Sequence, residues 1–280
     1  LTWSDVCPAE RMMTSPDTCY AVAACNLSQA SENKIHDDTV ARRLGFTGGL
    51  VPGVEVYAYA SHLAVRQWGR AWLEHGTMSI RFERPVYDGR IAIVSGCSAD
   101  DGASLSLTVA SDGARSATGV AACPRRDPAA GRHLEGLAVP PPPAAASRPA
   151  ADEVSLAEGR LLATTGSVLT SGDIAEYAAA VREQHGLYSR EGIAHPGQLL
   201  RLCNLVLREN VVLPPWIHTG SVVTNLGLAR AGETIAARAR VARNYDKKGH
   251  RLVDLDVLVT ADGRPAVRVL HTAIYRLRAG

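Results

Sequence analysis

The chain has 280 residues, of which 46% are apolar and 21% charged, and its net charge is +2. This is the composition of a globular protein long enough for one large domain or two ordinary ones. The near-neutral charge gives no reason to expect nucleic acid or a membrane surface as a partner. No apolar run is long enough for a transmembrane helix, and the first residues lack the pattern of a signal peptide, so we expect a cytoplasmic protein.

Six cysteines are scattered along the chain without a C-x-x-C pair. This distribution favours reduced thiols of a cytosolic protein over a disulfide or metal framework. We therefore expect no metal site.

The first half of the chain predicts one strand, a polar loop, a helix and four more strands. The strand is expected at 17–26 and the helix at about 52–69, where side chains are apolar or small over most of the circumference, as in buried helices. Strand-like runs follow at 77–82, 90–95, 104–110 and 115–122, separated by turns rich in Asp and Gly. This order is typical of an antiparallel sheet wrapped around one helix.

Residues 124–153 are rich in proline and alanine, and Pro140 to Pro143 are consecutive. Such a segment favours extended polyproline II structure. We expect a surface linker with little regular structure, which divides the chain into domains at 1–123 and 154–280.

The second half repeats the order of the first. It predicts a strand at 160–168, a helix at about 174–183, a polar turn at 184–191, a strongly apolar helix from Pro196 to about 210, and strands at 218–226, 234–243, 251–260 and 266–277. The two Pro-Gly helix entries are 144 residues apart (196 minus 52), and the glycines before the next long strands are 143 apart (232 minus 89). These near-equal offsets indicate an internal duplication of about half the chain.

One stretch of the first half has the residues for chemistry. It reads SENKIHDD, so that His36 lies in a polar turn, and it leads through a glycine-rich loop to Pro52-Gly53 at the start of the apolar helix. The first turn of a helix has free backbone N–H groups and a positive macrodipole end. An imidazole and an anion-stabilising helix end are two of the parts needed to form an enolate or oxyanion.

This stretch resembles the MaoC-like hydratase/dehydratase family of hot-dog proteins, in which a loop with Asp, Asn and His precedes a Gly-Phe pair and a Pro-Gly helix entry. The matching positions are Asn33, His36, Asp38, Gly45-Phe46 and Val51-Pro52-Gly53. Lys34 replaces a proline of the family, and Ser31 stands where the family has its catalytic Asp. The resemblance covers both halves and implies an α+β double hot-dog: two antiparallel sheets, each wrapped around a long central helix and joined into one continuous sheet.

The resemblance also implies a function. The implied function is that of a hydro-lyase of fatty acid metabolism, which adds or removes water on an acyl thioester of coenzyme A or a carrier protein, without metal or redox cofactor. In this family His36 would move the proton, Asn33 would position groups, Gly53 would hold the enolate oxygen through its N–H, and Ser31 would occupy the remaining catalytic position. A double hot-dog mimics the two-fold dimer of single hot-dog proteins, and a homodimer of double hot-dogs is a further expectation.

Other residues are expected to bind substrate or to mark the weaker half of the duplication. The substrate-binding candidates are Asp38, Val51, Pro52, Tyr57, Tyr188 and His218, and Arg84 or Arg243 could meet a phosphate. In the second half Glu183, His185 and Tyr188 fall where the first half has Ser31, Asn33 and His36. Because a tyrosine replaces the histidine, we expect this half to be degenerate, and Glu183 to lie at a solvated helix end.

The serine at position 31 leaves a second class of function open. A serine without a partner cannot act as a general base at neutral pH, so the chain could instead bind acyl groups, partner an active subunit, or hydrolyse thioesters. A carboxylate across a small cavity from His36 would favour the hydratase, and an apolar or blocked cavity the alternative.

Overall fold

The computed structural model describes residues 18–125, 134 and 138–278. The first 17 residues of the expected N-terminal domain and much of the expected linker, at 126–133 and 135–137, lie outside the described residues.

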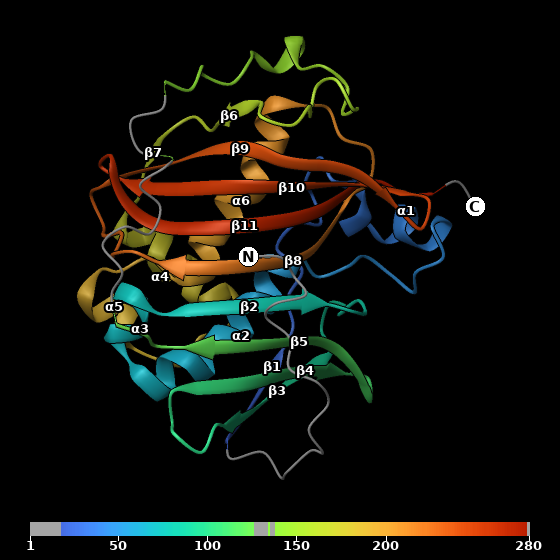
Figure 1. The fold of residues 1–280 in the computed structure, drawn as a ribbon. Coiled ribbons are helices and arrows are strands. Elements are labelled where there is room, and N and C mark those ends of the chain that lie inside the picture. The colour runs from blue at the N-terminus through green and yellow to red at the C-terminus, as the bar shows by residue number, and fades with distance from the viewer. Residues whose placement is uncertain (1–17, 126–133, 135–137, 279–280) are drawn as a thin grey trace.

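The described chain is built on one sheet of eleven strands, and all its paired strands are antiparallel. Its order is β1-β3-β4-β5-β2-β8-β11-β10-β9-β6, with β7 paired to β9 (Figure 1). The first half supplies β1 (Thr18–Ala23), β2 (Thr77–Phe82), β3 (Ile91–Ser98), β4 (Ser104–Ser111) and β5 (Ala114–Ala122). The second half supplies β6 (Leu161–Ala163), β7 (Ser167–Val168), β8 (Ile217–Asn225), β9 (Thr234–Lys247), β10 (His250–Ala261) and β11 (Arg264–Arg276).

The two halves have the same strand order and meet at equivalent strands. β2 is the last strand in the order of the first half, β8 is its counterpart in the second, and they pair antiparallel, with Thr77 opposite Thr224 and Arg81 opposite Gly220. This arrangement confirms the α+β double hot-dog expected from the sequence, with one continuous sheet.

Two long helices, α2 (Gly53–Trp68) and α6 (Pro196–Asn210), pack against each other on one face of the sheet (Figure 1). Every residue of α2 from Val54 to Val65 is buried. The shorter helices are η2 (Lys34–His36), α1 (Asp38–Arg43), α3 (Arg70–His75), η4 (Ala145–Ser147), α4 (Ser171–Ala180) and α5 (Leu187–Glu191). The expected polar turn at 184–191 thus contains a short helix, and the expected strand at 160–168 is two short strands.

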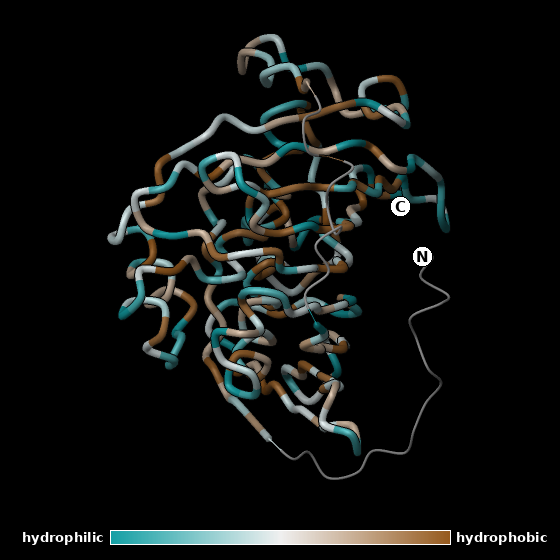
Figure 2. Tube along the Cα trace, turned by 60° about the vertical axis from the view of Figure 1, so that its left-hand side comes forward, coloured by the Kyte–Doolittle hydropathy of each residue, from teal (hydrophilic) through white to brown (hydrophobic). Residues whose placement is uncertain are grey.

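The core lies between the helices and the sheet. Figure 2 shows hydrophobic stretches through the middle of the molecule and hydrophilic ones at many loops. No disulfide joins the described cysteines 19, 25, 123 and 203. No described helix is long and apolar enough to cross a membrane.

The described end of the linker packs on the second half. Ala151 N donates to the carbonyl oxygen of Val212 at 2.9 Å, and Val212 N donates to that of Pro149 at 2.8 Å. Arg148 forms an ion pair with Glu32, at 3.0 Å between Nη1 and Oε2. The end of the linker thus contacts the second half through backbone bonds and the SENKIHDD loop of the first half through the ion pair.

The two central helices cross where α6 has a glycine. A Cβ atom added at Gly197 would lie 2.7 Å from the Cβ of Ala58 and 3.2 Å from the carbonyl oxygen of Val54, and it would overlap the hydroxyl of Tyr177. The close approach of α2 and α6 therefore requires glycine at this position.

We predict that Gly197→Ala destabilises the protein by about 1–3 kcal/mol, the usual cost of overpacking a core. Urea denaturation monitored by circular dichroism measures the change. Gly172→Ala is the control, because the nearest atom to a Cβ there is the hydroxyl of Thr170, at an ordinary 3.5 Å. Equal stability of the Gly197 variant and the wild type would contradict the tight crossing.

Candidate functional site

Asn33 connects the first half's polar loop to the start of β8 in the second half. Its Oδ1 accepts from the backbone N–H of Trp216 at 3.2 Å, and its Nδ2 donates to the Trp216 carbonyl oxygen at 3.0 Å. Because a backbone N–H only donates and a carbonyl only accepts, this pair of bonds fixes which way the Asn33 amide points. Oδ1 also accepts from Ile35 N and so caps the turn that carries His36.

The hydrogen-bond partners of the two ring nitrogens of His36 fix its tautomer. Its Nδ1 lies 2.7 Å from the carbonyl oxygen of Leu50, which can only accept, so Nδ1 carries the hydrogen. Its Nε2 lies 3.2 Å from Nδ2 of Asn33, a donor, and therefore holds a lone pair. Burial lowers the pKa of His36 to about 4, with smaller contributions in the same direction from Arg201 and Arg208. At neutral pH His36 is a neutral imidazole with an acceptor at Nε2.

The loop between His36 and α2 is held by carboxylates and glycines. Asp37 accepts from Val40 N and caps α1. Asp38 accepts from Gly49 N at 2.7 Å and pairs with Arg42 at 3.2 Å, so it orders the loop.

The first turn of α2 offers an unpaired amide. Pro52 provides no side-chain cap, and its carbonyl oxygen accepts from the amides of Glu55 and Val56. This leaves the Gly53 N–H with no acceptor among the described residues. A Cβ atom on Gly53 would lie 2.8 Å from Nδ1 of His218 and 2.9 Å from the Phe82 ring, so this helix start packs closely against the start of β8.

A cavity of about 270 Å³ lies at these groups, on the boundary between the halves. It is largely apolar, with a few polar groups, as small-molecule sites usually are. Its lining residues include Asn33, His36, Gly53 and Val56 from the first half and Asn204, Trp216, His218 and Ile274 from the second. Glu83 is the one carboxylate of this lining, and it accepts from Arg115 at 2.9 Å and from Thr118 at 3.1 Å.

His218 brings a second imidazole to the cavity. Its Nε2 lies 3.1 Å from the carbonyl oxygen of Gly220 and 2.8 Å from the hydroxyl of Ser221. Its Nδ1 is buried and has no hydrogen-bond partner among the described residues. The ring packs edge-on against Phe82, with 4.8 Å between centroids.

The structure brings six of the ten expected catalytic and substrate-binding residues to this cavity: Asn33, His36, Val51, Pro52, Gly53 and His218. Arg84, the possible phosphate contact, lines it as well. Four others are elsewhere. The Ser31 hydroxyl donates to the Asn33 carbonyl oxygen at 3.3 Å, Asp38 holds its loop, and Tyr57 and Tyr188 are buried outside the lining.

The sequence reading missed Phe82, Asn204 and Trp216. A lone amide within the apolar run of α6 was a signal for Asn204, which has a buried Oδ1 without a partner in the described chain.

The second half has a closed cluster of charged and aromatic side chains at the start of α6. Glu183 is not at a solvated helix end as expected, because its side chain is only 2% exposed. Its carboxylate contacts Nδ1 of His62 at 2.7 Å and Nε2 of His195 at 3.2 Å. His195 is the N-cap of α6 and packs against the Tyr188 ring at 4.6 Å between centroids. Both carboxylate oxygens of Glu183 are therefore paired with histidines.

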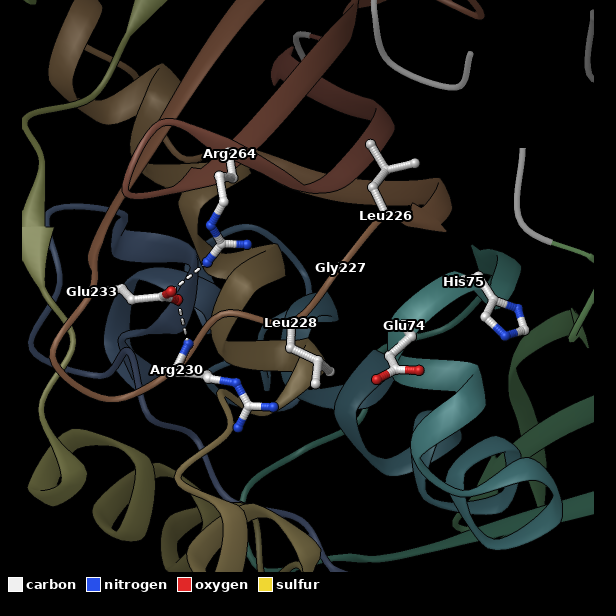
Figure 3. A pocket seen from close by; sticks show the side chains of 8 residues that line it. All are labelled: Glu74, His75, Leu226, Gly227, Leu228, Arg230, Glu233 and Arg264. Carbon is white, nitrogen blue, oxygen red and sulfur yellow. Dashed lines mark hydrogen bonds and ion pairs between the residues drawn. The ribbon is translucent and has the colours of Figure 1, made fainter. Parts of the chain in front are cut away.

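A second hollow, of about 480 Å³, lies between the end of α3 and the β8–β9 connection (Figure 3). Its charged groups largely satisfy one another: Glu233 pairs with Arg264 and accepts from the backbone N–H of Arg230, and Glu74 pairs with Arg70 at 2.8 Å. We assign no chemistry to this hollow.

Comparison with known proteins supports the fold. No family model and no curated protein sequence matches the chain. A conserved hypothetical protein of Mycobacterium tuberculosis described as a double hot-dog superimposes with a TM-score of 0.63 at 13% identity, covering 94% of this chain and 96% of its own. A MaoC domain dehydratase of Chloroflexus aurantiacus gives 0.59 at 12%, covering 96% and 97%. An oleoyl thioesterase of Lactobacillus plantarum gives 0.51 at 11%, covering 94% and 96%. At these identities the likeness shows the double hot-dog fold, which dehydratases and thioesterases share.

We predict that Glu183→Gln destabilises the protein by about 3–5 kcal/mol, because it leaves buried histidines without their anionic partner. Chemical denaturation at neutral pH measures the change. Exposed Glu176→Gln on α4 is the control and should stay within about 0.5 kcal/mol of wild type.

We predict that the stability of wild type and of the Glu183→Gln variant depends differently on acidic pH. Burial opposes ionisation of Glu183, but hydrogen bonds from His195 and His62 outweigh it and hold the pKa of its carboxyl well below the ordinary value. Its contribution is therefore complete above the unfolded pKa of about 4.3 and is lost as the pH falls towards the folded value. Between about pH 5 and pH 3 the Gln variant should lose less stability than wild type, and equal losses would contradict this role.

Proposed function

We propose that the chain is a hydro-lyase that adds water to, or removes it from, a short acyl thioester. The observation that supports this most is the convergence of two neutral imidazoles and the free Gly53 amide on one largely apolar cavity. An oxyanion donor and a proton acceptor, shielded from bulk water, are what formation of a thioester enolate needs.

In the proposed reaction the thioester carbonyl oxygen accepts from the Gly53 N–H at the positive end of α2. Water attacks the β-carbon of the enoyl group, and the electron pair of the double bond moves towards that oxygen. Nε2 of His36 accepts a hydrogen bond from this water, in exchange for the long contact with Asn33. The attacking water loses one proton as its oxygen bonds to the β-carbon, and this proton is then delivered to the α-carbon. No metal or redox step is part of this reaction.

The size and rim of the cavity favour a short acyl group on a phosphate-bearing carrier. Its volume is just below the roughly 300–1,000 Å³ of typical ligand pockets, too small for a long chain beside the thioester. Arg84 lines it, is exposed and makes no ion pair among the described residues, whereas Arg243 pairs with Asp254 at 3.7 Å. We propose Arg84 as the contact for a phosphate of coenzyme A or of a carrier-protein arm.

Thioester hydrolysis is the second candidate. It is favoured by the lack of a free carboxylate among the described residues that line the cavity, where the hydratase family has its Asp. Water held by an imidazole could attack the thioester carbonyl itself, with the same oxyanion donor.

A panel of trans-2-enoyl thioesters of coenzyme A, from butenoyl to dodecenoyl, tests the proposal. We expect a 3-hydroxyacyl product with no released thiol, and faster turnover of butenoyl than of dodecenoyl thioester because of the cavity volume. Mass spectrometry detects the product, and a thiol reagent detects hydrolysis. Release of free thiol without hydration would establish the second candidate, and no reaction of any thioester would reject both.

We predict that His36→Ala lowers kcat/KM for butenoyl thioester by about 10²–10⁴-fold, the usual contribution of a group that assists proton transfer. Ser31→Ala should cost less than about tenfold, because its hydroxyl makes one bond to the loop backbone. His250→Gln, at the start of β10 and outside the cavity lining, is the control. Full activity of the His36 variant would remove this residue from the reaction.

A further inference from the structure

His218 is the one histidine of the cavity whose lone pair has no partner in the described chain. The residue is 6% exposed, yet its buried Nδ1 contacts no hydrogen-bond donor there. A Cβ atom added to Gly53 would lie 2.8 Å from this Nδ1, so Nδ1 lies against the first turn of α2, where the oxyanion donor is. Leaving a buried acceptor unpaired costs free energy, so this atom calls for an explanation.

The neighbours of the other ring nitrogen fix which one carries the hydrogen. Nε2 faces the carbonyl oxygen of Gly220, which can only accept, so the hydrogen is on Nε2. Nδ1 therefore holds a buried lone pair beside Gly53, in a side chain that lines the cavity. Burial and the neighbouring His271 hold the pKa of His218 well below its ordinary value, which keeps the ring neutral.

We infer that His218 is a second catalytic residue of the proposed reaction: its Nδ1 receives the proton that water loses during attack on the β-carbon. This inference rests on the proposed function. It gives the cavity the second proton acceptor that Ser31 does not supply, and it places that acceptor on the second half of the chain.

The step balances with the groups present. Water has two hydrogens, one donated to Nε2 of His36 and one to Nδ1 of His218. As the oxygen bonds to the β-carbon, the second proton moves to Nδ1, and the double-bond electrons form the enolate held by Gly53 N–H. The His218 imidazolium then returns this proton to the α-carbon, and both histidines end neutral.

Ser221 and His271 are positioning residues for His218. The Ser221 hydroxyl lies 2.8 Å from Nε2 of His218 and 3.1 Å from Nδ1 of His271, so it can accept from the first and donate to the second. The two imidazoles stack with 4.1 Å between centroids. Burial lowers the pKa of His271 to about 3, so its ring stays neutral. With the hydrogen on Nε2, its Nδ1 lone pair accepts from the Ser221 hydroxyl. This order holds the Nε2–H tautomer of His218.

Kinetics of matched variants test the assignment. His218→Gln keeps a polar group near the position of Nε2 and removes the lone pair at the cavity. We expect kcat for butenoyl thioester to fall about 10²–10⁴-fold with KM within a few fold. Ser221→Ala should cost under about tenfold, because Gly220 still accepts from Nε2. His250→Gln should leave turnover unchanged. A His218→Gln protein that retains kcat within tenfold would overturn the inference while leaving the proposed function standing.

A second measurement does not depend on any variant folding. Nitrogen-15 NMR of the imidazoles in the wild-type protein distinguishes protonated from unprotonated ring nitrogens. We expect a hydrogen on Nε2 of His218 at neutral pH, and a shift of its Nδ1 signal when unreactive butyryl-coenzyme A binds. A hydrogen on Nδ1, or an unchanged Nδ1 signal with saturating butyryl-coenzyme A, would overturn the assignment even in an active protein. A wild type inactive on every thioester of the panel would instead reject the proposed function, and the role of His218 with it.

Discussion

The candidate site depends on the paired hydrogen bonds between the side chain of Asn33 and the backbone of Trp216. They join a loop of the first half to the start of a strand in the second, across 183 positions of sequence. Trp216 is two residues before His218, so the contact that orients the His36 loop also sets where the second imidazole enters the cavity. An asparagine suits this role because one amide offers a donor and an acceptor to the two backbone groups.

Burial gives the histidines of the chain two different functions. At the cavity, His36 and His218 have carbonyl or hydroxyl neighbours, and desolvation keeps both rings neutral. At the start of α6, His62 of the first half and His195 of the second share the Glu183 carboxylate, each through one ring nitrogen. The same residue type is thus a hydrogen-bond acceptor at the cavity and part of a structural network at the start of α6, according to whether a carboxylate is within reach.

Much of the fold followed from local patterns. The apolar circumference of 52–69 and the Asp-Gly turns after it predicted the buried helix and the meander, and the matching Pro-Gly offsets predicted the duplication. The errors arose where propensity is weak: α5 is only five residues long, and the strand expected at 160–168 is broken by Thr164, Thr165 and Gly166.

The site was only partly predictable, because its lining comes from segments far apart in sequence. The loop motif predicted Asn33, His36 and Gly53, since these lie in one stretch. Nothing local showed that Trp216 would meet Asn33, or that Nδ1 of His218 would be left unpaired. The position of Glu183 also depends on tertiary packing, which buries a residue that sequence alone placed in solvent.

The antiparallel pairing of β2 with β8 joins equivalent edge strands of the two halves within a single chain. In a homodimer of single hot-dogs, any substitution appears in both copies, so one site cannot change without its twin. Covalent fusion removes that constraint. The half with α6 can hold an ion cluster where the half with α2 borders a cavity, while the two halves remain in fixed one-to-one stoichiometry at any expression level.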